Sequence, residues 1–226
     1  MLPKILTSGL FAGFCAGLIA ALLQLIFVQP VLLHAELYEG GDLIYNMLEG
    51  APSQPDIPGF DAMRDGLSVL FSALIYVGYG LILVAFMSIA NAQGIAISAH
   101  QGIVWGLAGF VTIHLAPSFS LPPEVPGMAS ADLAARQVWW WGTAVATGVG
   151  LALIAFGRSA LFMAAGAVPM VAPHLLGAPE PAVFTGPLPP EVASLFAVRA
   201  LGVSMAAWAT LGLFAAYFWQ RETQDA

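Results

Sequence analysis

Long apolar runs without charged side chains limit what this sequence can fold into. Residues 5–28 form one such run, and as a helix rising about 1.5 Å per residue it would be about 36 Å long. That length crosses a hydrocarbon core of about 30 Å, and it exceeds the 7–15 apolar residues typical of a cleaved signal peptide. A membrane β-barrel would instead show alternating hydrophobicity. The chain is therefore predicted to be an all-α membrane protein that keeps its first helix.

Six long apolar runs predict the helices of a single transmembrane domain over residues 1–226. They lie near residues 5–28, 67–90, 102–116, 138–156, 160–176 and 195–219. The third and fifth runs are short, so five or six of them are expected to cross the bilayer. Charged residues make up only 8% of the chain, whereas soluble domains carry about 25%. The formal charge of −7 argues against nucleic acid as a partner, because nucleic-acid binding requires a basic face.

The acidic residues gather in the loops after the first, third and fifth runs. With six crossings these loops share one side of the membrane. Every Asp and Glu except Glu222 and Asp225 lies in them, so that side is predicted to attract cations. Lys4 precedes the first run, and positive charge favours the cytoplasm. Both termini are therefore predicted to be cytoplasmic and the acidic loops external.

A short motif, LPPEV, occurs at residues 121–125 and again at 188–192. A histidine precedes each copy and an arginine follows it, and the first pair of runs has weaker counterparts. The histidines are His34, His114 and His174, and the arginines are Arg64, Arg136 and Arg199. One interpretation is three repeated helical hairpins around a pseudo-threefold axis, which would bring the three imidazoles together near the outer interface. The alternative is that Pro, Gly and Leu recur by chance in membrane loops.

The three histidines are the strongest candidates for metal ligands, together with Glu36 and Glu39. Neutral imidazole suits divalent cobalt, nickel, copper or zinc, and carboxylates can complete the coordination sphere. If the first helix continues past residue 28, the two glutamates share one of its faces. The alternative is that each histidine only forms hydrogen bonds to the backbone or to lipid headgroups.

The arginines would repel a metal ion unless acidic residues neutralise them. Asp132 lies four residues before Arg136, and Asp61 and Asp65 flank Arg64. The spacing predicts local ion pairs at both places.

The sequence lacks the motifs of common enzymes. It contains no phosphate-binding Gly-x-x-x-x-Gly-Lys-Ser/Thr loop, no His-Glu-x-x-His, no Gly-x-Ser-x-Gly and no pair of cysteines. Its loops are also too short to form a soluble catalytic domain. The chain is predicted not to be an enzyme and to hold no permanent cofactor.

The longest match to a known family is GLAGFVTIHLAPSFSLPPEVPGMASADLAARQVWWWGTA, over residues 106–144. This segment, with residues 29–40, 171–179 and 189–201, resembles the CbtA-type predicted cobalt transporter subunits. The resemblance implies a bacterial inner-membrane protein that takes up Co²⁺ for cobalamin synthesis beside a small single-span CbtB-type subunit. The residues alone indicate only a divalent cation. The competing hypothesis is a non-transporting scaffold subunit that holds a partner through its glycine-lined helix faces.

Overall fold

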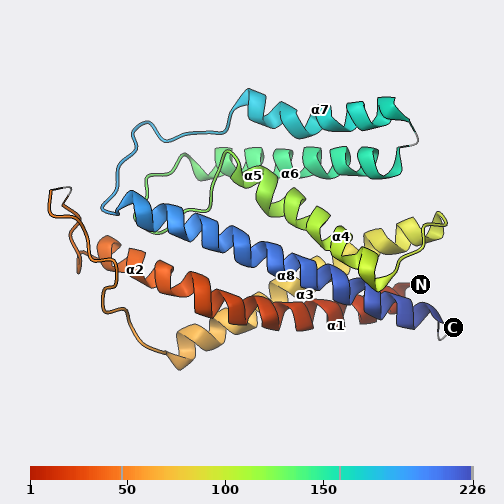
Figure 1. The fold of residues 1–226 in the computed structure, drawn as a ribbon, viewed down its shortest axis with the longest axis horizontal. Coiled ribbons are helices and arrows are strands. Elements are labelled where there is room, and N and C mark those ends of the chain that lie inside the picture. Colours follow the sequence, from red (N-terminus) through yellow and green to blue (C-terminus); the bar gives the residue numbers. More distant parts are fainter. Residues whose placement is uncertain (47, 158, 225–226) are drawn as a thin grey trace. The chain divides into compact units, whose positions relative to one another are not determined.

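The chain is built of helices, shown in Figure 1, and the computed structural model describes residues 1–46, 48–157 and 159–224. The elements are α1 (Leu2–Leu23), the π-helix η1 (Gln24–Val28), α2 (Gln29–Glu39), α3 (Ala62–Ala92), α4 (Ala99–Phe110), the π-helix η2 (Val111–Leu115), α5 (Ala116–Ser118), α6 (Leu133–Phe156), α7 (Ala160–Leu176) and α8 (Pro190–Gln224). No strand occurs within the described ranges, apart from an isolated bridge between Asn46 and Gly50. The all-α prediction is confirmed.

Among the residues that the structure describes, four helical stretches are long and apolar enough to cross a membrane. They are Leu2–Glu39, Ala62–Ala92, Leu133–Phe156 and Pro190–Thr223, and Ala160–Leu176 is a shorter apolar helix. Large apolar side chains stay exposed along these helices, for example Phe11 on α1 and Phe71 on α3. Such surfaces suit a lipid environment. The prediction of five or six crossings stays a prediction.

Most helices extend beyond the predicted apolar runs, and acidic residues cap the starts of α3 and α6. Asp61 caps α3 by accepting a hydrogen bond from the Arg64 backbone N–H at 2.7 Å. The first helix also continues through η1 into α2, so part of the predicted first loop is helical. His34, Glu36 and Glu39 therefore lie on a helix and not in a loop.

Both π-helices end two residues before a proline. Val28 ends η1 ahead of Pro30, and Leu115 ends η2 ahead of Pro117. Proline lacks an N–H, and its ring crowds the carbonyl four residues earlier, which in both cases belongs to the π-helical turn. A widened turn makes room for the ring without ending the helix. The first and second hairpins thus share a backbone feature. No such turn occurs in the described part of the third hairpin, residues 160–224. The predicted threefold repeat stays a prediction.

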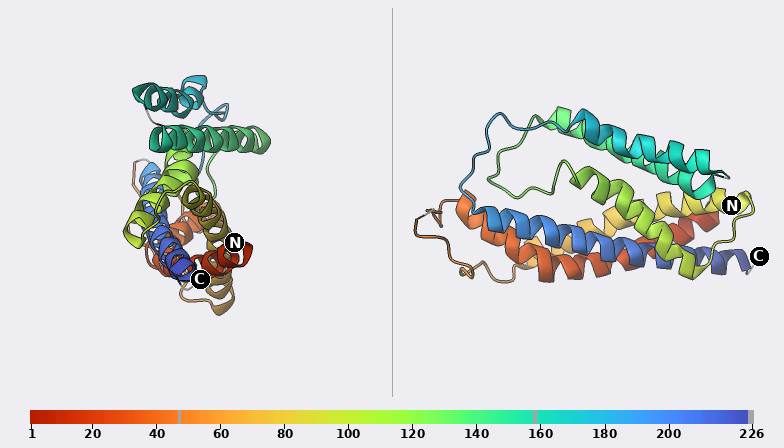
Figure 2. Two further views of the ribbon diagram at one scale, coloured as in Figure 1. Left: turned by 90° about the vertical axis from the view of Figure 1, so that its right-hand side faces the viewer. Right: turned by 45° about the horizontal axis from the view of Figure 1, so that its top comes forward.

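The chain forms two compact units, and the predicted single domain over residues 1–226 stays a prediction. The first unit comprises Met1–Phe27, Gly59–Phe110 and Gly202–Ala226. Its helices α1 and α3 lie side by side in Figures 1 and 2 and pack through glycines. A Cβ added at Gly9 would lie 2.8 Å from the Leu81 Cα, and one added at Gly80 would lie 2.6 Å from the Gly9 carbonyl oxygen. The two backbones approach this closely only because side chains are absent.

The second unit comprises Val28–Pro58 and Val111–Leu201. Its helices α6 and α7 form a hairpin, visible in Figure 1, that packs where Gly150 meets Gly166. A separate apolar cluster surrounds the buried Tyr38 and joins α2 to the loop before α6 and to the start of α8. Its buried members are Val31, Ala35, Tyr38, Val125, Leu188 and Val192.

The two LPPEV copies differ in conformation although their valines share this cluster. Val125 lies in a loop, whereas Val192 lies in the first turn of α8. The two valines occupy the same position in the motif and pack in the same cluster, but they lie in different secondary structures.

Candidate functional site

His114 lies in η2, just before the chain leaves the helix for the loop that leads to α6. Its half-buried side chain lines an open pocket of about 380 Å³ within the second unit. The other polar lining residues are Ser118, Glu124, Arg136 and Gln137, and Trp140 and Trp141 add aromatic surface. The pocket therefore combines an imidazole, a carboxylate, an amide and a hydroxyl. Nitrogen and oxygen donors of this kind suit divalent transition metals.

An ion pair between Glu124 and Arg136 forms one wall of this pocket. Arg136 Nη2 donates to Glu124 Oε2 at 2.6 Å, and both side chains are mostly shielded from solvent, with exposed fractions of 27% and 22%. Ser130 Oγ donates to the same oxygen at 2.8 Å. The charges of Glu124 and Arg136 are thus balanced within the pocket.

The predicted partner of Arg136 was wrong. Asp132 does not pair with it but caps α6, accepting a hydrogen bond from the Ala135 backbone N–H at 2.9 Å. A pair four residues apart requires both residues to be inside the helix. Asp132 has a non-helical ψ of 131°, which turns its carboxylate to the helix end. The other predicted local pair is confirmed, since Arg64 Nε lies 2.7 Å from Asp65 Oδ1.

His174 lies near the C-terminal end of α7, in an aromatic setting. Its Nδ1 is 3.0 Å from Ser120 Oγ, in hydrogen-bond contact. Its ring meets Phe119 and Trp139 edge-on, with centroid distances of 5.2 and 5.8 Å. The Ser120 contact and the two rings hold the imidazole in one orientation. A metal ion would have to use the other ring nitrogen.

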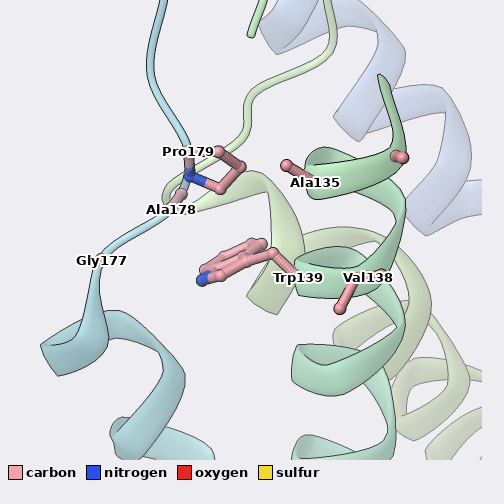
Figure 3. Close-up of a pocket in the computed structure, with 7 residues that line it drawn as sticks. Ala135, Val138, Trp139, Gly177, Ala178 and Pro179 are labelled. Atoms are coloured by element: carbon pink, nitrogen blue, oxygen red, sulfur yellow. The ribbon is translucent and has the colours of Figure 1, made fainter. Parts of the chain in front are cut away.

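Trp139 also lines a second pocket, of about 640 Å³, between α6 and the segment after α7. In Figure 3 the Trp139 ring lies across from Ala178 and Pro179. The lining side chains are small or apolar: Ala134, Ala135, Val138, Trp139, Gly177, Ala178 and Pro179. Without carboxylates or imidazoles in its walls, this pocket is not suited to an ion.

His34 lies on α2, where its ring stacks at a tilt over Tyr38, with a centroid distance of 5.5 Å. Both polar atoms at this place, His34 Nε2 and Tyr38 Oη, are buried and have no hydrogen-bond partner among the described residues. Glu36 and Glu39 are exposed on the same helix. The two glutamates can therefore meet an incoming cation, whereas His34 is turned toward the apolar cluster.

Replacing Tyr38 with Phe is expected to raise the free energy of unfolding by about 1 kcal/mol. A buried hydroxyl without a partner costs about 1–3 kcal/mol, and Phe keeps the ring that fills the cluster. Thermal unfolding of the purified protein in detergent measures the effect, with Tyr217→Phe as an exposed control. A lower melting temperature for Tyr38→Phe would mean that the hydroxyl has a bound partner.

The three histidines do not form a preformed cluster in the second unit. His34 contacts Tyr38, His114 lines the pocket with Glu124, and His174 contacts Ser120. Within the part of the chain that the structure describes, no group of three or more His, Cys, Asp or Glu side chains is placed to hold a metal ion. The role of these residues as ligands stays a prediction.

Sequence reasoning missed Glu124 as a member of the site. It treated this residue as one of many loop carboxylates and gave Arg136 a nearer partner. The signal that could have found it is the repeated motif LPPEV, which places a glutamate in a rigid, proline-flanked segment.

Apolar helices joined through glycines, with charged side chains at helix ends and in loops, define an α-helical membrane protein. The chain belongs to the family described as probable cobalt transporter subunit (CbtA), whose model matches residues 2–220. No curated protein and no solved structure gives a match. Membership of this family makes the protein a transporter subunit, which acts with partners on a transported metal ion.

Proposed function

We propose that this protein carries Co²⁺, or a related divalent metal ion, across the bacterial inner membrane for cobalamin synthesis. The observation that carries the proposal is the family match over nearly the whole chain. The ion is the cargo, and no permanently bound cofactor is needed. The membrane potential favours entry of a dication by about 4.6 kcal/mol per 100 mV.

In this proposal both termini are cytoplasmic and the acidic loops face outward. Support comes from the first unit, where Lys4 Nζ donates to the Glu222 carbonyl oxygen at 2.6 Å. The start of α1 and the end of α8 therefore lie at the same end of that unit, as Figure 1 also shows. This placement supports an even number of crossings. The external carboxylates raise the local concentration of cations.

The proposed ligands are His34, Glu36, Glu39, His114 and His174. Because no cluster is preformed, we propose that the ion is passed between them and is not held by all at once. The exposed glutamates on α2 would bind the hydrated ion first, and the half-buried imidazoles would replace part of its water. A small single-span CbtB-type subunit is the proposed partner.

Cobalt accumulation in cells tests this proposal. Cells that express the chain with its single-span partner should accumulate ⁵⁷Co well above cells with the empty vector, and the purified chain should bind Co²⁺ in titration calorimetry. The alternative, a scaffold subunit, requires that the purified chain bind no Co²⁺ while it still copurifies with its partner. Accumulation at the level of the empty vector would reject the transport function.

A further inference from the structure

We propose that the His114 pocket is a divalent-cation site in which Glu124 is a direct ligand and Arg136 limits the affinity. The inference deepens the proposed function and rests on it. It adds Glu124 to the ligands predicted from sequence, and it assigns the Glu124–Arg136 ion pair a role in ion release.

The two oxygens of Glu124 have different surroundings. Oε2 accepts both of the contacts that the carboxylate makes, from Arg136 Nη2 at 2.6 Å and from Ser130 Oγ at 2.8 Å. Oε1 has no hydrogen-bond partner among the described residues. One oxygen is thus anchored, which fixes the orientation of the carboxylate, and the other is available to a cation. Hydrogen-bonded carboxylates are common metal ligands, and Ser130 supplies such a hydrogen bond without adding a charge.

Further donors line the same pocket. His114 supplies an imidazole, and Ser118 and Gln137 supply neutral oxygens. A volume of about 380 Å³ has room for an ion that keeps several waters. With one histidine and one carboxylate, the pocket has fewer charged ligands than a permanent metal site. Its remaining ligands would be the neutral oxygens and water.

Arg136 makes this site weaker, which suits transport. Its guanidinium neutralises the carboxylate and repels a dication in the same pocket. A transport site must bind strongly enough to admit the ion and weakly enough to release it. Arg136 Nε is buried without a hydrogen-bond partner among the described residues, so the arginine is held mainly through Glu124. An ion that binds Oε1 therefore competes with Arg136 for the same carboxylate.

Co²⁺ binding to the purified full-length protein in detergent tests the site. Glu124→Gln is expected to raise the Kd about tenfold or more, since a charged ligand is lost. Arg136→Gln is expected to lower the Kd about three- to tenfold, since a repelling charge is removed. The control is Glu191→Gln, which alters the exposed glutamate of the second LPPEV copy and should leave the Kd unchanged.

A purely structural ion pair makes a different prediction. Both Glu124→Gln and Arg136→Gln would then lower the melting temperature. The two variants would not shift the Kd for Co²⁺ in opposite directions. Equal Kd values for Glu124→Gln and Glu191→Gln would overturn the proposal, as would weaker binding in Arg136→Gln. If Glu124→Gln or Arg136→Gln fails to fold, His114→Gln, which removes the imidazole from the same pocket and leaves the ion pair in place, should still raise the Kd.

Cobalt accumulation separates this inference from the proposed function. One outcome is that the wild type accumulates ⁵⁷Co and that Glu124→Gln accumulates as much with an unchanged Kd. That outcome would reject the site but would still support the transport function. Opposite Kd shifts in the two variants without accumulation by the wild type would support the site and reject transport.

Discussion

Replacing Gly80 with leucine should abolish recovery of folded protein, whereas leucine at Gly78 should be tolerated. A Cβ at Gly80 would lie 2.6 Å from the Gly9 carbonyl oxygen and 3.1 Å from the Gly13 Cα. These are backbone atoms of α1 and cannot move without separating the two helices. Overpacking of a tight core costs about 1–3 kcal/mol or more, and a whole leucine between two backbones lies at the upper end.

The measurement is the yield of monodisperse protein in detergent size-exclusion chromatography, followed by the melting temperature. Gly78 is a matched control, since it lies in the same helix and no described atom lies within 4 Å of a Cβ built there. Leucine at Gly78 would only add apolar surface to the helix. Similar yields for both variants would contradict the close approach of α1 and α3.

This packing changes how the scaffold hypothesis can be tested. The scaffold hypothesis places a partner on glycine-lined helix faces, so replacing an α1 glycine such as Gly13 with leucine would be the natural way to release that partner. A Cβ at Gly13 would collide with the Val77 Cα of α3, inside the same unit. Loss of the partner in that variant would therefore report misfolding of this chain. Exposed positions such as Leu175 on α7 are better sites for a partner test.

Replacing His114 with alanine should reduce ⁵⁷Co accumulation about tenfold or more at an unchanged protein level. Loss of a group that only hydrogen-bonds a metal ligand already costs about 10–100-fold in metal affinity, and His114 is proposed as a direct ligand. Of the polar groups that line this pocket, the His114 imidazole is the nitrogen donor that suits Co²⁺. The measurement is uptake of ⁵⁷Co by cells, normalised to the amount of protein in the membrane.

His100→Ala is the control, because this exposed histidine lies in the first turn of α4 and belongs to no proposed site. His114→Gln is a second variant that keeps a polar side chain of similar length in η2. Accumulation equal to wild type in both His114 variants would remove this residue from the ligand set. Loss of accumulation in His100→Ala to the same extent would point to a general defect.

One polar side chain inside the apolar first helix has its partner on another helix. Gln24 accepts a hydrogen bond from Ser72 Oγ of α3 at 3.1 Å. That contact accounts for a polar side chain in an apolar helix, since unpaired polar groups are costly in hydrocarbon. The π-helices could not be read from apolar runs, because the turn before Pro30 or Pro117 has the same composition as an α-helical turn.

Run length, scarcity of charge and local motifs depend only on neighbouring residues. The order of residues therefore predicted an all-α protein, the approximate positions of most of its helices and its family. Packing between elements that are distant in the chain set which groups meet: Arg136 with Glu124, His174 with Ser120, and Gly80 with Gly9. These contacts depend on how helices cross and where loops return, and no local pattern specifies that geometry.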